Sequence, residues 1–338
     1  MLMIVKQGNS GLWPNWPVLI GWACALCMLT LAAKADFSTR PEVRAWVLEQ
    51  SDLGFSHAEV MQMLKVTKRQ PKVLPILAKA PESNWVWSDY RARLLSTQRI
   101  KAGKKFIKAY ASELALVADT YGVEARYIAA IAGVETNYGG YTGRFPVLGT
   151  LATLAFEHPR RQSFFRKELA HYLRLSYQQG FDPLSVRGSA AGAMGMAQFM
   201  PSSYQAYAKD GDGDGAIDLL SNTSDSLASI ANYLARHGWR EGEPVILPIA
   251  MHSTVVAVSK QAKKGGELGA YWQQSGVALA TGVDWPLQQD VQYRLYSFST
   301  HEKPEYILAT GNFYAITRYN HSLWYARLVT ELAEAIQE

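Results

Sequence analysis

Apolar side chains recur at helical spacing through the first half of the chain. Residues 41–48 and 56–64 predict two short helices, the second with a capping-box start. Apolar positions across 106–121 predict one helix that ends at Gly122. An apolar helix is predicted over 125–134. This half of the chain is therefore predicted to be helical.

The second half mixes helices with strands. Residues 162–178 and 224–237 predict amphipathic helices. Between 243 and 317 the pattern changes, and three short runs separated by turn residues predict strands, at 245–247, 291–295 and 306–308. A last helix is predicted over 323–336. The pattern indicates a predominantly α, α+β fold in which a small β-rich insertion interrupts a helical body.

The N-terminus carries an almost unbroken apolar run, residues 18–33. The run is short for a membrane span and leads into a small-x-small sequence, Ala-Lys-Ala, that is typical of signal-peptide cleavage. We interpret 1–35 as a signal peptide, with an uncleaved anchor as the alternative because Lys6 is the only positive side chain ahead of the run. Cys24 and Cys27 both lie within the run, so cleavage would leave no disulfide or thiol chemistry.

Composition and charge exclude several function classes. The chain has 338 residues and a formal net charge of +5, but no dense Lys/Arg cluster, so a nucleic-acid partner is not indicated. The seven histidines show no close pairing of the kind that binds zinc, which leaves a zinc amidase or peptidase unsupported. Aromatic residues make up 12% of the chain and would suit sugar-binding surfaces, although core packing explains them equally well.

Glu135 is the first candidate for chemistry. It lies in the segment 133–139, where the predicted apolar helix gives way to a glycine-bracketed loop. Flanking Ile131, Val134 and Tyr138 would disfavour the ionised carboxylate and raise its pKa toward a value useful for a general acid. The alternative is a surface glutamate that caps or pairs at a helix end.

Residues 188–204 form a second candidate segment, rich in glycine, alanine and serine. Small residues permit a ligand to approach the backbone closely, and Gln198 offers both a donor and an acceptor to a hydroxyl or acetamido group. Ser189 does not lie in a G-x-S-x-G elbow, so serine-hydrolase chemistry is not indicated. A tight helix-packing segment is the alternative, and it explains the glycines better than it explains Gln198.

A third candidate is an acidic loop that follows the spacing of an EF-hand. Oxygen donors fall at positions 1, 3, 5, 7 and 9, supplied by Asp210, Asp212, Asp214, the Ala216 carbonyl and Asp218. Gly215 occupies the position of the sharp turn, whereas Ser221 stands where the closing glutamate is usual. Carboxylates this close repel each other unless a cation lies among them, so we expect a structural Ca²⁺. A solvated acidic turn is the alternative.

Together these motifs resemble those of the B-type lytic murein transglycosylases. The resemblance continues in four further segments, namely 145–156, the pair Arg160-Arg161, 231–239, and 316–322 with Tyr325. It covers about residues 41–336, essentially the whole chain after the predicted signal peptide.

The resemblance implies a lysozyme-like helical core that holds a glycan-binding cleft. The implied divisions are an N-terminal helical region at 36–105, the core at 106–240, a small β-rich domain at 241–312, and a C-terminal helix at 313–338 that returns to the core. It also suggests a lengthened calcium loop, 210–225, whose closing carboxylate is Asp225.

Site residues carry over position by position. Glu135 matches the catalytic acid/base, and Arg160 and Arg161 match a basic pair near the peptide-binding side. The positions that match the substrate-binding cleft are Ser189, Gln198, Phe199, Tyr233, Tyr319, Asn320 and Tyr325. Ala197 departs from the family, which usually has proline or glycine before the glutamine, and this puts subsite preference in doubt.

The implied activity is non-hydrolytic cleavage of peptidoglycan to 1,6-anhydromuropeptides by a monomeric periplasmic enzyme. Its expected partners are glycan strands, with cell-wall synthesis proteins as further candidates, and no organic cofactor is expected beside the calcium ion. Two alternatives stay open. One is a hydrolase of the goose-lysozyme kind, which would need a second carboxylate to hold a water molecule. The other is a non-catalytic murein-binding or scaffold protein.

Overall fold

The computed structural model describes residues 36–78, 85–250, 266–286 and 290–337. The predicted signal peptide, 1–35, lies outside the described residues. Within them, none of the helices has both the length and the apolar character needed to cross a membrane.

The chain begins with short N-terminal helices: η1 (Phe37–Thr39), α2 (Pro41–Leu48), α3 (His57–Val66) and α4 (Val73–Ala78). The capping box predicted for α3 is present, since the Ser56 hydroxyl accepts the Glu59 N–H at 3.3 Å and the Glu59 carboxylate accepts the Ser56 N–H at 2.7 Å. Val60 and Leu64 of this helix are buried. Both helices predicted for this part are confirmed.

The helical body follows. Its elements are α5 (Trp87–Leu94), α6 (Thr97–Ala109), α7 (Ala111–Tyr121), α8 (Ala125–Thr136), α9 (Val147–Glu157), α10 (Gln162–Gln179), α11 (Pro201–Tyr207), α12 (Thr223–Arg236), α15 (Gly311–Tyr319) and α16 (Leu323–Gln337), with a two-stranded ribbon of β1 (Phe145–Pro146) and β2 (Arg187–Gly188). The helices predicted over 125–134, 162–178, 224–237 and 323–336 are confirmed to within two residues at each end.

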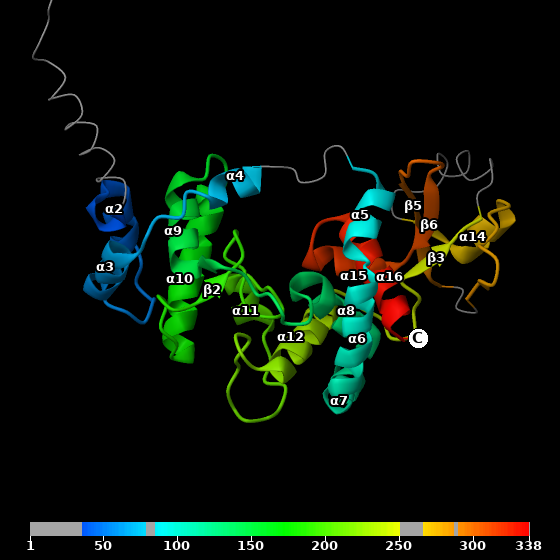
Figure 1. Cartoon of the computed structure of the whole chain (residues 1–338), viewed down its shortest axis with the longest axis horizontal. Helices are drawn as coiled ribbons and strands as arrows, with labels where there is room; N and C mark the ends of the chain where they lie inside the picture. The colour runs from blue at the N-terminus through cyan, green and yellow to red at the C-terminus, as the bar shows by residue number, and fades with distance from the viewer. Residues whose placement is uncertain (1–35, 79–84, 251–265, 287–289, 338) are drawn as a thin grey trace, which may run out of the picture.

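Helix α8 occupies the centre of this body. It packs against α6, α7, α12 and α16 (Figure 1). Every residue from 127 to 133 is buried, as expected for a helix that is apolar on all sides and enclosed by other helices. The enclosed helix places Glu135, in its last turn, beside α16, which is far from α8 in the sequence.

The prediction of one helix over 106–121 is wrong, because α6 and α7 are separate helices. Tyr110 lies between them with φ −114° and ψ 32°, outside the helical region. Its ring packs on Phe106 at a centroid distance of 4.7 Å. Neither glycine nor proline marks this break, so it depends on packing that the local sequence does not display. Helix α6 itself runs without interruption across 105–106, where the expected division of the chain fell.

The C-terminal segment, 313–338, holds most of α15 as well as α16, the helix predicted over 323–336. Helix α15 ends at Asn320, whose backbone is extended at φ −141° and ψ 124°. The Ser322 hydroxyl then accepts the N–H of Tyr325 at 3.3 Å, as an N-terminal cap of α16 does. The break changes the direction of the chain before Tyr325, whose hydroxyl donates to Glu135.

The β-rich part consists of β3 (Ile246–Pro248), β4 (Glu267–Leu268), α14 (Gly269–Gln274), β5 (Gln292–Phe298) and β6 (Glu305–Ala309). The strands form one antiparallel sheet in the order β3-β6-β5-β4, with Leu295 opposite Leu308 and Leu247 opposite Leu308 on its other side. A separate small core lies here, made of Leu247, Ile249, Trp272, Val277, Val291, Tyr293 and Leu308. The three predicted strands are confirmed, and β4 was missed.

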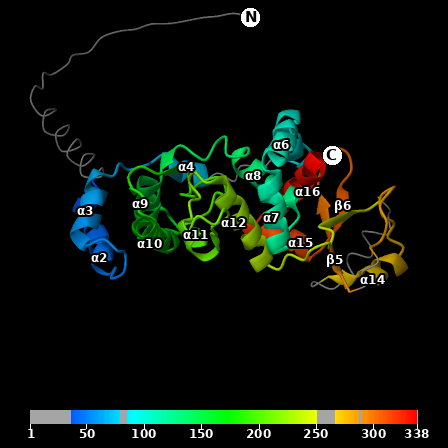
Figure 2. The ribbon, with the colours of Figure 1, turned by 90° about the horizontal axis from the view of Figure 1, so that it is seen from below.

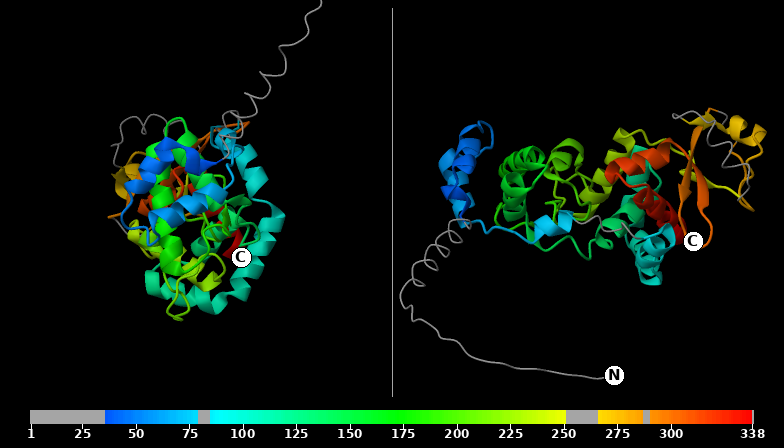
Figure 3. Two further views of the ribbon diagram at one scale, coloured as in Figure 1. Left: turned by 90° about the vertical axis from the view of Figure 1, so that its left-hand side faces the viewer. Right: turned by 90° about the horizontal axis from the view of Figure 1, so that it is seen from above.

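These parts follow one another along the long axis of the molecule. Helices α2 and α3 lie at one end, the sheet and α14 lie at the other, and α8 to α12 lie between them (Figures 1 and 2). Figure 3 shows the same order from above, with β5 and β6 beside α15 and α16. Helix α8, which carries Glu135 in its last turn, therefore lies between the two ends of the molecule.

Candidate active site

Glu135 lies half-buried in the last turn of α8. Its Oε1 atom accepts a hydrogen bond of 2.6 Å from the hydroxyl of Tyr325 on α16. Burial raises the pKa of Glu135 to about 7, and the hydrogen bond from Tyr325 opposes this rise by favouring the ionised form. The carboxyl group is therefore able to hold a proton and to release it near neutral pH.

The turn after Glu135 has an unusual backbone. Asn137 and Tyr138 both have positive φ, 51° and 61°, and Gln198 has φ 50°. These are the only residues other than glycine with positive φ in the part of the chain that the structure describes. Such conformations cost free energy and are kept where the surrounding structure imposes them, which is common at functional sites.

Thr136 joins this turn to the glycine-rich segment. Its hydroxyl lies 3.1 Å from the carbonyl oxygen of Ala132 and 3.2 Å from that of Met196, and it accepts the N–H of Gly139 at 2.9 Å. Thr136 is buried. The sequence reasoning did not identify this residue, and its position directly after Glu135 was the only available signal. The contact fixes Glu135 relative to the segment that carries Gln198.

Gln198 uses both of its amide hydrogens within the protein. Its Nε2 atom donates to the carbonyl oxygens of Thr142 and Gly195, each at 2.9 Å. Oε1 has no hydrogen-bond donor among the described residues. These two bonds set the orientation of the amide group, so Gln198 can offer a ligand an acceptor but no donor. The sequence had led us to expect both a donor and an acceptor.

Ser189 is also oriented by the backbone. Its Oγ accepts the N–H groups of Ala191 and Ala193 at 3.2 and 3.0 Å, which leaves the hydroxyl hydrogen to donate. Asn320 lies exposed at the end of α15. Both residues therefore have polar groups that a ligand could contact.

Aromatic side chains pack together beside Gln198. The rings of Phe199, Tyr233 and Tyr319 lie 4.9 to 5.7 Å apart between centroids. The Tyr319 hydroxyl donates to the carbonyl of Ala197 at 2.6 Å, and the Tyr233 hydroxyl donates to that of Arg318, also at 2.6 Å. Burial raises the pKa of Tyr319 well above its usual value, and the nearby charge of Glu135 acts in the same direction. This ring cluster connects α12, α15 and the glycine-rich segment at one site.

Arg160 and Arg161 lie apart from this group, at the corner between α9 and α10. Arg161 stacks on the rings of Phe164 and Phe165 at 4.1 and 5.3 Å. Arg160 is exposed and lines a groove between α2 and α10. No hydrogen bond, ion pair or ring contact joins either arginine to Glu135 among the described residues. The structure thus joins Tyr325 to Glu135 and packs Phe199, Tyr233 and Tyr319 together, but among the described residues it connects neither arginine to Glu135.

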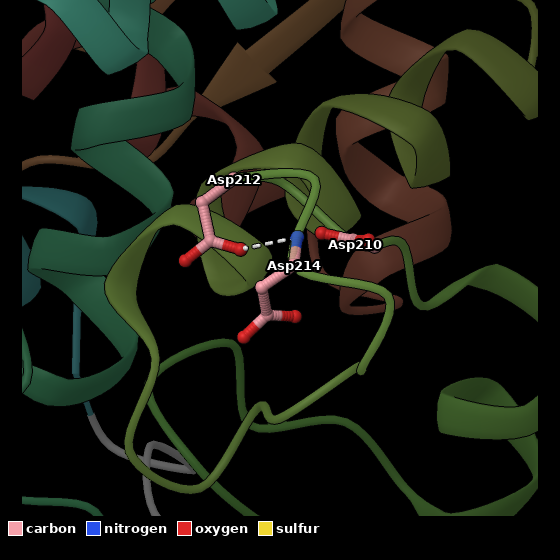
Figure 4. Close-up of side chains that lie close together, drawn as sticks. All are labelled: Asp210, Asp212 and Asp214. Carbon is pink, nitrogen blue, oxygen red and sulfur yellow. Dashed lines mark hydrogen bonds between the residues drawn. The ribbon is translucent and has the colours of Figure 1, made fainter.

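The acidic loop collects three carboxylates in one place. Asp210, Asp212 and Asp214 each offer an oxygen within 4.8 Å of the others (Figure 4). The loop is held in shape by its own backbone, since Asp210 accepts the N–H groups of Gly213 and Gly215 at 2.6 and 2.9 Å. Three oxygens converging on one point fit a hard cation such as Ca²⁺, which binds carboxylate oxygens.

Asp225 closes the loop from α12. It is buried, and its two oxygens accept the N–H groups of Gly211 and Asp218 at 2.8 and 2.6 Å. Burial raises the pKa of Asp225, and repulsion from Asp212 and Asp210 acts in the same direction. In this structure, Asp225 therefore fastens the two ends of the loop together.

Comparison with known proteins agrees with this geometry. Residues 38–334 match the family model of the transglycosylase SLT domain. Membrane-bound lytic murein transglycosylase B of Escherichia coli K12 is 34% identical over 313 residues, 89% of this chain and 84% of that protein. The crystal structure of the soluble lytic transglycosylase SltB1 from Pseudomonas aeruginosa has a TM-score of 0.79 and 37% identity, over 88% of this chain and 98% of that one.

The Escherichia coli lytic transglycosylase Slt35, solved in complex with calcium, also has a TM-score of 0.79. It is 32% identical, over 90% of this chain and 95% of that one. The predominantly helical, lysozyme-like fold and the family expected from the sequence are thereby confirmed. With the family model spanning nearly all the described residues, this chain belongs to the transglycosylase SLT domain family.

Proposed function

We propose that this protein is a lytic transglycosylase that cleaves the β-1,4 bond between N-acetylmuramic acid and N-acetylglucosamine in peptidoglycan. The observation that carries the proposal is the half-buried Glu135, hydrogen-bonded to Tyr325 and with its pKa raised to about 7. Family membership and the names of the relatives support murein as the substrate.

Glu135 acts first as an acid. The protonated carboxyl group gives its proton to the glycosidic oxygen, the bond from that oxygen to C1 of the muramic acid breaks, and the N-acetylglucosamine side leaves as an alcohol. The acetamido carbonyl of the muramic acid stabilises the positive charge that develops at C1, as in substrate-assisted glycosidases.

The same carboxylate then acts as a base. It takes the proton of the C6 hydroxyl of the muramic acid, whose oxygen bonds to C1 and closes the 1,6-anhydro ring. Glu135 is protonated again at the end, so one residue completes the cycle and no water is consumed. A pKa near 7 suits a group that must give and take a proton in turn.

A single carboxyl group argues against the hydrolase alternative. Burial and the Tyr325 hydroxyl account for the pKa of Glu135, and no second carboxylate perturbs it among the described residues. A hydrolase of the inverting kind needs a second carboxylate to activate water. A pure binding protein, in turn, has no use for an acid desolvated in this way.

The remaining residues would bind and orient the sugar. Gln198 would accept a hydrogen bond from an acetamido N–H or a hydroxyl group, and Ser189 would donate one. The rings of Tyr233, Tyr319 and Phe199 would support the cleft wall. Arg160 and Arg161, away from the carboxylate, would contact carboxylates of stem peptides, because both are exposed cations.

The acidic loop would hold Ca²⁺ through Asp210, Asp212, Asp214 and the Ala216 carbonyl, with Asp225 closing the loop. The three converging carboxylates and the calcium complex of Slt35 support this assignment. The ion would neutralise the acidic cluster and brace the loop, and it would take no part in bond cleavage. The apolar run at 18–33 and the proposed substrate support a location in the periplasm, in contact with glycan strands.

The test is mass spectrometry of purified murein after digestion by the protein, beside Glu135→Gln as the matched variant. We expect anhydromuropeptides from the wild type and none from Glu135→Gln. Products with reducing ends would instead identify a hydrolase. Absence of products from both proteins, with binding to murein retained, would identify a binding or scaffold protein.

A further inference from the structure

The end of the acidic loop, residues 217–219, contacts the backbone that holds Gln198. We call these residues the loop exit. Gly195 accepts from Gln198 twice, at 3.2 Å from its backbone N–H and at 2.9 Å from its side-chain amide. On its other side, Gly195 leaves no room, since a β-carbon added there would lie 1.9 Å from the carbonyl oxygen of Leu219. Leu219 therefore touches the backbone of the residue that orients Gln198.

Tyr204 on α11 fixes this loop exit. Its hydroxyl donates to the carbonyl of Ile217 at 2.8 Å and accepts the N–H of Leu219 at 3.0 Å. The residue between them, Asp218, donates its N–H to Asp225. Tyr204 is buried, so water cannot easily replace its hydroxyl in these two bonds.

The same contact borders open space. A hollow of about 220 Å³ is lined by Thr142 and Met196 from the Gln198 side and by Leu219 and Asn222 from the loop side. Asn222 also donates to the Asp212 carboxylate at 2.8 Å. With a hollow on this side, the loop exit can shift unless a specific bond prevents it.

We infer that Tyr204 is a positioning residue for sugar recognition, whose hydroxyl holds Leu219 against Gly195 and so fixes the acceptor oxygen of Gln198. The acidic loop thereby acts on the cleft through three consecutive contacts. Tyr204 does not touch the substrate, so its loss weakens sugar binding without changing the proton transfers at Glu135. This inference rests on the proposed function.

The first test removes the hydroxyl alone. In the full chain carrying Glu135→Gln, which prevents cleavage, calorimetry measures the affinity for the tetramer of N-acetylglucosamine. We expect Tyr204→Phe to weaken binding roughly five- to tenfold, as loss of about one hydrogen bond does. With Glu135 present, KM for murein rises while kcat and its pH profile change little.

The matched control is Tyr172→Phe. Tyr172 is equally buried, and its hydroxyl donates to the carbonyl of Pro183 at 2.8 Å, away from the loop exit. It loses a comparable hydrogen bond, so it reports the effect of reduced stability alone. We expect it to lower the melting temperature while leaving the affinity for the tetramer unchanged.

A second variant tests the contact at Gly195. Gly195→Ala introduces the clash with Leu219 at φ 67°, and Gly180→Ala introduces a side chain at φ 70° with no atom within 4 Å. We expect only Gly195→Ala to weaken binding. Unchanged affinity in both Tyr204→Phe and Gly195→Ala would overturn the inference alone. Failure of the parent protein to bind the tetramer would overturn it together with the proposed function.

Discussion

The hydroxyl of Tyr325 donates a 2.6 Å hydrogen bond to Glu135, although 190 positions separate the two residues in the sequence. Two effects change the pKa of Glu135 in opposite directions. Burial favours the neutral acid, whereas the hydrogen bond from Tyr325 favours the carboxylate. Their balance leaves the pKa of Glu135 at about 7. Tyr325 thus keeps the pKa of Glu135 below the value that burial alone would give.

Removal of the Tyr325 hydroxyl should move the pH dependence of cleavage upward. Tyr325→Phe eliminates the bond that stabilises the carboxylate, so the pKa of Glu135 rises above 7. Since the first step requires the protonated acid, activity should persist to higher pH. The kcat at the optimum should fall, because the carboxylate loses the hydrogen bond that orients it. Initial rates against pH would show the shift. Tyr319→Phe is the control, because the Tyr319 hydroxyl donates to the carbonyl of Ala197. An equal shift of the pH dependence in both variants would contradict the role assigned to Tyr325.

Glu135 should reduce the stability of the folded protein at neutral pH. Its pKa is raised from 4.5 to about 7, so between these values the unfolded chain loses the proton while the folded protein keeps it. The folded state therefore loses stability as pH rises through this window, and the loss is constant above it. Glu135→Gln should gain about 3 kcal/mol at pH 8 and nothing at pH 4.

Denaturant unfolding at several pH values would measure this gain. Glu49→Gln is the control because Glu49 is exposed on the surface. A gain for Glu135→Gln that is equally large at pH 4 and pH 8 would mean that its cause is packing and not ionisation.

The helices around the site could be predicted because their signals are local. The Ser56 and Glu59 pair, the apolar run of α8 and Gly122 at the end of α7 each determine a boundary within a few residues. The break at Tyr110 could not be predicted, because no residue beside it disfavours a helix. The backbone conformation there accompanies packing of the Tyr110 ring on Phe106. Local propensity is easily overridden by tertiary contacts of this kind.

The same distinction between local signals and long-range contacts applies to the site residues. Glu135 and Gln198 were identified from their motifs, but the orientation of the Gln198 amide depends on Thr142, which lies 56 positions away. The role of Thr136 depends on the carbonyl of Met196, 60 positions away. Residue types indicate which chemistry is available, whereas long-range contacts decide which atoms remain free for a ligand.

Gly133 should be sensitive to substitution despite lying inside a helix. Alanine normally stabilises a helix interior relative to glycine by about 1 kcal/mol. Here an added β-carbon would lie 2.5 Å from the ring of Tyr138. Gly133→Ala should therefore destabilise the protein and lower kcat by displacing the turn after Glu135. In a Tyr138→Leu background the same substitution should cost less, and equal costs in both backgrounds would show that the clash is not the cause.

Calcium should stabilise the protein through the acidic loop. An ion that binds only the folded state adds about 2.7 kcal/mol to the free energy of unfolding at a concentration one hundred times its Kd. The melting temperature should therefore rise by several degrees in millimolar Ca²⁺ and fall again with a chelator.

Asp212→Asn should reduce this response to Ca²⁺ because it removes one of the three clustered carboxylates. Asp119→Asn, an exposed change on α7, should leave it intact. Mg²⁺ should substitute poorly, since it requires a tighter octahedral site. An identical response in Asp212→Asn and the wild type would place the ion elsewhere.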